Sequence, residues 1–254
     1  MEGWTLYLVL SVVLFALSFL SGMMGLGVAF IATPVLAMFG LDLKTEIMPM
    51  SLWLNGVTAI SGAVAFARRR MVDWRTAVPL LIVTTIAAPI GVLVLRFTST
   101  AVLWWLYVAV LVFLAYRMAV PPHQDDSAPS AVTDATRWKA TGASSGIGAF
   151  AGLLGVGPGF LMMPTLVLLG FAARTAAATN SVVVILPSFS AFIAHLPDAR
   201  FNWTLLVMTT ITSIAGAQWG AGFMATRMKS LTLTRIFAAA LVVLAVQRVF
   251  ALVG

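Results

Sequence analysis

Ten apolar stretches separated by short polar connections leave little of this chain able to face water. They occupy approximately residues 4–21, 28–40, 47–67, 76–95 and 101–119, followed by 140–154, 158–171, 176–196, 204–224 and 232–252. Charged residues make up 9% of the 254 residues, whereas soluble domains contain roughly 25%. This composition excludes a water-soluble globule, and we expect an all-α polytopic membrane protein.

The stretches differ in length, and the length of each indicates whether it can cross a membrane as a helix. Residues 47–67 would form a helix about 32 Å long, which is enough to cross a hydrocarbon core of about 30 Å. Residues 28–40 would reach only about 20 Å, which is typical of a half-helix or a re-entrant segment. Residues 158–171 are short in the same way.

The two sets of five stretches form an internal repeat. A shift of 130 positions places identical residues on Gly22, Gly25, Gly27, Phe30, Pro34, Leu36, Gly40, Thr45 and Ser51. With a shift of 129, Trp74 meets Trp203 and Gly91 meets Gly220. We therefore expect membrane repeats at residues 1–120 and 140–254, joined by a polar linker at residues 121–139.

Five segments per half would turn the second copy upside down, giving inverted topology. If every segment reverses the chain, eleven basic residues share one side: Arg68, Arg69, Arg70, Arg75, Arg117, Arg137, Lys139, Arg174, Arg227, Lys229 and Arg235. Lys44, Arg96, Arg200 and Arg248 then lie on the other side, and the split becomes 9 to 6 if the two short segments do not reverse the chain. The positive-inside rule favours the first arrangement, with both termini outside the cytoplasm. A hairpin that dips in and returns has the same parity as two full crossings, so both remain open.

Glycine-rich breaks precede both short segments. Gly22, Gly25 and Gly27 precede the first, and Gly152, Gly155, Gly157 and Gly159 precede or open the second. Inverted-repeat carriers bind anions at such breaks, where free backbone amides and the positive ends of helix dipoles face the ligand. Close helix packing is the alternative reason for the glycines.

Polar residues in the apolar segments are further candidates for a binding site. In the third and eighth segments these are Ser51, Asn55, Asn180 and Ser181, and in the ninth Gln218 lies beside Trp219. Asparagine is costly to bury, so Asn55 and Asn180 are expected either to line the site or to find a partner within the protein. For Thr58 and Ser61 we expect bonds to carbonyls of their own helix. Interhelical packing is the alternative for Gln218.

The chain lacks the residues that catalysis would need. It has no cysteine and two histidines, and its acidic residues all lie at segment ends or in connections. His195 is the one intramembrane candidate for protonation. We therefore expect no enzyme activity, no metal and no cofactor, and the apolar surface argues against a nucleic-acid partner.

The glycine elements resemble those of the TauE/SafE sulfite exporter family, also called toluene-sulfonate uptake permeases. The resemblance rests on Gly22–Gly27 through Pro34, on Gly152–Phe160 through Pro164, and on the basic loop with Asp73 and Trp74. It implies an inner-membrane transporter of sulfite, sulfoacetate or related sulfonates. By this resemblance the probable site scaffold is Gly25, Gly27, Pro34, Gly155, Gly157, Gly159 and Pro164. The sequence departs from the family's glycine pattern at Val28 and Ala29.

We therefore expect a carrier that exports small sulfur-containing anions by alternating access. A passive anion channel and a non-transporting membrane scaffold are the alternatives. The lipid bilayer is the expected surrounding, and faces that point to lipid are available for a homodimer interface.

Overall fold

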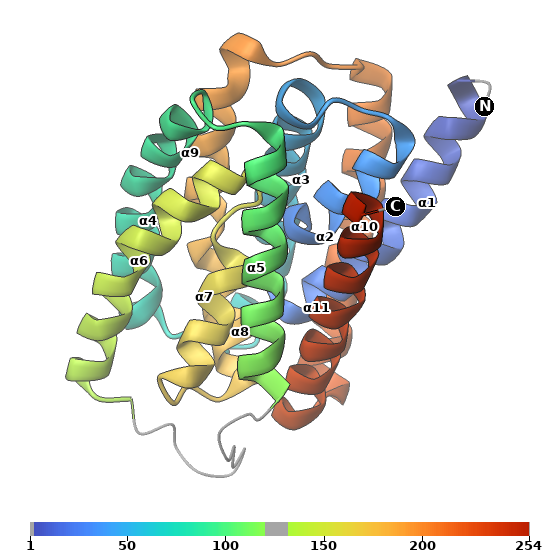
Figure 1. The fold of residues 1–254 in the computed structure, drawn as a ribbon. Coiled ribbons are helices and arrows are strands. Elements are labelled where there is room, and N and C mark those ends of the chain that lie inside the picture. Colours follow the sequence, from blue (N-terminus) through green and yellow to red (C-terminus); the bar gives the residue numbers. More distant parts are fainter. Residues whose placement is uncertain (1–2, 120–131, 254) are drawn as a thin grey trace.

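The computed structural model describes residues 3–119 and 132–253, and within these ranges every regular element is a helix. In chain order the α-helices are α1 (Gly3–Met24), α2 (Ala29–Leu36), α3 (Met48–Arg68), α4 (Trp74–Leu95), α5 (Thr100–Ala119), α6 (Asp134–Leu154), α7 (Gly159–Leu168), α8 (Ala173–Val183), α9 (Ile185–His195), α10 (Trp203–Arg227) and α11 (Ser230–Val253). Single turns of other helix types are η1 (Ala37–Phe39), η2 (Leu43–Ile47) and η3 (Leu196–Asp198). The expected all-α fold is confirmed (Figure 1).

Each predicted apolar stretch lies in one of these helices, with two differences. α6 begins at Asp134, inside the predicted linker, where the Thr133 hydroxyl accepts the N–H of Thr136 and caps the helix. The stretch 176–196 is two helices rather than one, because Pro187 has no N–H to donate to the carbonyl of Val183 and the helix is interrupted at Val184. Most of the predicted linker, residues 120–131, lies outside the described residues.

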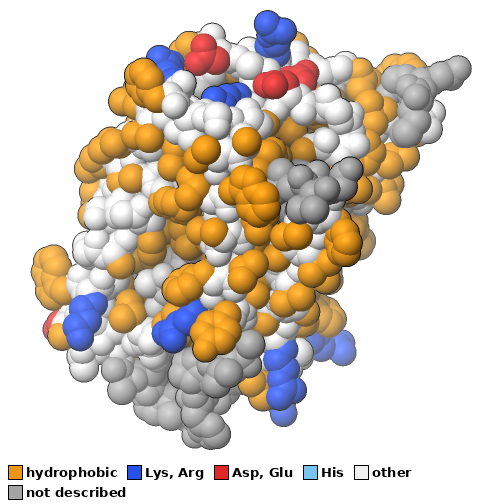
Figure 2. Space-filling view, viewed as in Figure 1, with side chains coloured by type: hydrophobic (Ala, Val, Ile, Leu, Met, Phe, Trp, Pro, Cys, Tyr) orange, Lys and Arg blue, Asp and Glu red, His pale blue; other side chains and the backbone are white. Residues whose placement is uncertain are grey.

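Six stretches of the described residues are long and apolar enough to cross a membrane. They are Trp4–Met24, Leu43–Arg68, Trp74–Leu95, Thr100–Arg117, Ala173–Asp198 and Ser230–Gln247. Hydrophobic side chains cover the middle of the molecular surface in Figure 2, and the Lys, Arg, Asp and Glu side chains in that view gather at its two ends. This distribution is that of a multi-pass membrane protein.

α1 and α2 form a hairpin whose two ends lie at the same end of the bundle. The Tyr7 hydroxyl near the start of α1 accepts from Asn202, and the Thr45 carbonyl beyond α2 accepts from the N–H of Arg200. The tip of the hairpin lies inside the bundle, because Gly27 is packed against Asn55 in the interior of α3. Both alternatives left by the charge count place the two ends of this hairpin at one end of the bundle, as observed.

α6 and α7 form a second hairpin, which enters from the other end. Arg137 at the start of α6 lies 3.5 Å from Asp73, and Arg174 beyond α7 lines the same pocket as Arg70. The tip again reaches Asn55, because Gly157 is packed against its amide. The shared pocket of Arg70 and Arg174 agrees with the arrangement in which every segment reverses the chain.

The hairpins are held by helices from the opposite half of the chain. α1 packs along α10, and α6 packs along α4. Glycines allow these backbones to touch: a Cβ added to Gly220 would overlap with the carbonyl of Phe19, and one added to Gly91 would overlap with the carbonyl of Ala149. Figure 1 shows both ends of the chain in the upper half of the view.

Candidate functional site

Two glycine-rich breaks have nearly the same backbone conformation. Between α1 and α2, Gly25 and Gly27 have φ of +63° and +72°, and between α6 and α7, Gly155 and Gly157 have φ of +64° and +73°. These values lie in the left-handed region, which glycine adopts without a Cβ clash. The predicted equivalence of the two breaks therefore extends to their backbone geometry.

Asn55 lies between the two breaks. A Cβ added to either Gly27 or Gly157 would overlap with its amide group, so both glycines are required for this close approach. The Asn55 Oδ1 accepts the N–H of Ala29 at 2.8 Å, and its Nδ2 donates to the Ser188 hydroxyl at 2.8 Å. Asn55 is fully buried. Asn55 is thus a buried polar group in contact with both breaks.

Asn180 ties the breaks to each other. Its Nδ2 donates to the carbonyl of Gly25 at 2.9 Å and to the carbonyl of Gly159 at 3.0 Å. Two carbonyl acceptors fix the orientation of the amide, which leaves the buried Oδ1 without a donor among the described residues. Because a bare amide oxygen repels an anion, Asn180 serves here as a brace for the two breaks.

The two short helices differ in how their first N–H groups are satisfied. In the α2 break, Val28 donates to the Thr58 hydroxyl at 3.3 Å and Ala29 donates to Asn55. In the α7 break, the N–H of Gly159 has no acceptor among the described residues, and the N–H groups of Gly157 and Phe160 have none either, as is also true of Gly27 and Phe30 in the α2 break. Helix starts carry a partial positive charge. The start of α7 is therefore a buried cluster of donors that an oxyanion would satisfy.

The two prolines lie inside the short helices. Pro34 cannot donate to the carbonyl of Phe30 four residues earlier, and the Tyr107 hydroxyl donates to that carbonyl instead. Pro164 leaves the Phe160 carbonyl in the same position in α7, where the residue equivalent to Tyr107 is Phe237. Phe30 and Phe160 stack on each other across the two helices.

Other predicted site residues are not brought to the breaks by any contact of the described residues. Ser181 donates to the Ala178 carbonyl of its own helix, and the buried Ser51 hydroxyl has no partner among the described residues. Gln218 accepts from Ser61 at 2.9 Å and lines a surface groove with Arg68 and Arg69.

The expected bonds of Thr58 and Ser61 have different outcomes. Thr58 donates to the Leu54 carbonyl of its own helix, as expected. The expectation for Ser61 is wrong, because its hydroxyl contacts the Ile214 carbonyl and Gln218 on α10. α10 packs closely enough against α3 to offer those partners, which a hydropathy pattern does not reveal.

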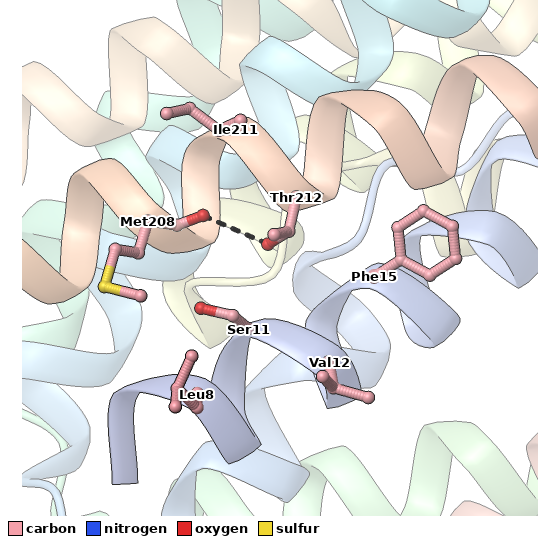
Figure 3. Close-up of a pocket in the computed structure, with 7 residues that line it drawn as sticks. All are labelled: Leu8, Ser11, Val12, Phe15, Met208, Ile211 and Thr212. Carbon is pink, nitrogen blue, oxygen red and sulfur yellow. Dashed lines mark hydrogen bonds between the residues drawn. The ribbon is translucent and has the colours of Figure 1, made fainter. Parts of the chain in front are cut away.

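A separate groove of about 430 Å³ opens between α1 and α10 (Figure 3). It is lined by Leu8, Ser11, Val12, Phe15, Met208, Ile211 and Thr212. The Thr212 hydroxyl donates to the Met208 carbonyl, so its proton is not available to a ligand. The side chains of Leu8, Val12 and Ile211 are more than half exposed on the molecular surface. This groove has the chemistry of a lipid-facing surface and contains none of the predicted site residues.

Comparison with known families gives one match, to the family described as Sulfite exporter TauE/SafE, over residues 10–248. The matched range includes both breaks, Asn55 and Asn180. It confirms the family expected from the glycine elements. Comparisons with curated proteins and with solved structures gave no match.

Proposed function

Because the chain belongs to the TauE/SafE sulfite exporter family, we propose that it exports small sulfur-containing anions across the inner membrane by alternating access. Sulfite, sulfoacetate and related sulfonates are the proposed substrates. The observation that carries the proposal is the meeting of both breaks at Asn55, where the start of α7 leaves N–H groups without acceptors. An oxyanion is the ligand that such donors favour.

We propose further that the two halves are inverted repeats that move against each other around this site. The hairpins enter from opposite ends of the bundle, and their glycines share φ values within a degree. The contact of Gly220 with Phe19 also repeats as the contact of Gly91 with Ala149. Carriers built this way rock one repeat against the other and expose a central site to each side in turn.

The charges favour export. Under the positive-inside rule, the end with Arg70, Arg137 and Arg174 faces the cytoplasm, and both termini lie on the other side. A cytoplasm-negative potential drives anions outward by roughly 2.3 kcal/mol per charge per 100 mV. An outward carrier of anions therefore needs no second ion.

Flux measurements in proteoliposomes test the proposal. The wild-type protein is expected to give saturable flux of sulfite or sulfoacetate that grows with an imposed membrane potential. Flux that does not saturate would indicate a channel. Absence of flux for both anions would contradict the proposed function.

A pair of alanine variants tests the site itself. Gly157→Ala adds a Cβ that overlaps with the Asn55 amide, whereas Gly40→Ala adds one with no atom within 4 Å. Both positions have positive φ, +73° and +78°, so the backbone strain is matched. We expect Gly157→Ala to lose transport and Gly40→Ala to retain it. Equal flux in both variants would exclude the break as the site.

A further inference from the structure

A polar pocket of about 390 Å³ lies at the end of the bundle where Arg137 meets Asp73. It lies between the α3–α4 connection and the start of α8, and is lined by Arg70, Met71, Val72, Asp73, Ala172, Arg174 and Thr175. None of the glycines of the two breaks lines it. The pocket is therefore a separate candidate for ligand binding.

The polar groups of the pocket leave an excess of positive charge. Arg174 uses Nη2 to bind the carbonyl of Ala225 at 2.8 Å, but its buried Nε has no acceptor among the described residues. The carboxylate of Asp73 is occupied, because it accepts from Thr76 and lies 3.5 Å from Arg137. Arg70 is exposed beside it. A buried guanidinium N–H without a partner favours an anion.

The other half of the chain offers an internal comparison. Lys44, which lies 130 positions before Arg174, donates to the carbonyl of Leu95, which lies 130 positions before Ala225. The two basic residues thus make equivalent contacts. Their surroundings differ in charge, because Asp42 corresponds to Ala172 and Glu46 corresponds to Ala176.

Asp42 supplies a carboxylate at this position in the first half, whereas in the second half the Ser230 hydroxyl accepts the N–H of Arg174 at 3.5 Å. Its Oδ1 accepts the N–H of Lys44 at 3.1 Å and the N–H and hydroxyl of Thr45 at 2.8 Å each. Beyond Ala172, the N–H of Thr175 has no acceptor among the described residues. In the first half, the backbone donors at these positions therefore bind a carboxylate.

We propose that the pocket between Arg70 and Arg174 binds a small oxyanion of the sulfite or sulfonate class beside the start of α8, where the first half of the chain carries the Asp42 carboxylate. The identity of the anion rests on the proposed function; the existence of the site does not. Only this end of the protein then captures the anion, because at the opposite end the carboxylate of Asp42 already takes those donors and repels it. The pocket is a loading site for export.

Equilibrium binding tests the pocket without transport. Sulfite, under anoxic conditions, and methanesulfonate are titrated calorimetrically into purified protein in neutral detergent at constant ionic strength. The titration is made on the wild type and on Gly157→Ala, in which the site at the breaks is blocked. We expect both proteins to bind, since the pocket is intact in both.

Two variants and a matched control test whether the anion binds in this pocket. Arg174→Gln is expected to weaken affinity at least about tenfold, because a charge-assisted donor is lost. Ala172→Asp rebuilds the arrangement of Asp42 and is expected to abolish binding. Arg235→Gln removes the same charge from an exposed position on α11 and is expected to change affinity less than twofold.

Unchanged affinity in Ala172→Asp would overturn the proposal. A loss of affinity in Arg235→Gln equal to that in Arg174→Gln would overturn it as well. Arg70→Gln leaves the contact of Arg174 with Ala225 intact and is expected to weaken binding, so a poorly folded Arg174→Gln does not decide the outcome. Binding without flux in the wild type would refute the proposed function and leave the pocket standing. Flux in the wild type together with unchanged binding in Ala172→Asp would refute the pocket and leave the proposed function standing.

Discussion

Phe30 and Phe160 stack with ring centroids 5.8 Å apart and ring planes inclined by 4°. Each is the second residue of its short helix and is almost fully buried. Because the two residues are 130 positions apart, the contact joins equivalent points of the two halves. It holds the starts of α2 and α7 side by side at the breaks.

A double-mutant cycle measures this contact. Phe30→Leu and Phe160→Leu each remove one ring and keep an apolar side chain in place. The coupling energy expected between them is about 0.5–1.5 kcal/mol in the free energy of unfolding, the usual value for an aromatic pair. Denaturant unfolding in mild detergent gives the value, and strict additivity would show that the rings stabilise the breaks independently.

The bond of Tyr107 to the Phe30 carbonyl predicts a conditional effect. Tyr107→Phe leaves that carbonyl without a donor, because Pro34 has no N–H, and should cost about 1–3 kcal/mol of stability. In a Pro34→Ala background the helix supplies its own N–H, so Tyr107→Phe should then cost less than half as much. An equal cost in both backgrounds would mean that the hydroxyl matters for another reason.

Two glycines, one in α4 and one in α6, predict opposite signs for substitution by alanine. Gly91→Ala would push a methyl into the carbonyl of Ala149 and should destabilise by about 1–3 kcal/mol. Gly142→Ala, in α6 with no atom within 4 Å of the added Cβ, should stabilise by up to about 1 kcal/mol. Melting temperatures of the two purified variants compare them directly, and a stabilised Gly91→Ala would contradict the backbone contact.

Asp42 predicts a pH dependence outside the apolar core. Hydrogen bonds from the backbone and hydroxyl of Thr45 hold the pKa of its carboxyl below the ordinary 3.8. Since the folded-state pKa is the lower one, its contribution is full above the unfolded pKa and is lost as pH falls through the folded pKa. Asp42→Ala should therefore lower the melting temperature at pH 6, and the difference from the wild type should shrink as the pH falls below 3.8. A constant difference over that range would contradict the interpretation.

Much of the architecture follows from local pattern, but the meeting of the breaks does not. Apolar runs and glycine spacing predict the helices, the short α2 and α7, and the family. That Asn55 lies between both breaks depends on how the hairpins cross, which no run of neighbouring residues encodes. Pro187 is a local signal for the interruption at Val184, but it lies within a continuous apolar run that predicts a single helix. Ser61 bonds across to α10 for the same tertiary reason.

The exchange of partners between the halves, with α1 on α10 and α6 on α4, means that neither half has its full set of neighbours alone. A chain cut within residues 120–131 would yield two fragments, each with two glycine-containing helix surfaces left uncovered: those of α1 and α4 in the first fragment, and those of α6 and α10 in the second. We expect the fragments to be degraded when made separately and to reassemble when made together. Each half is, in effect, the assembly partner of the other.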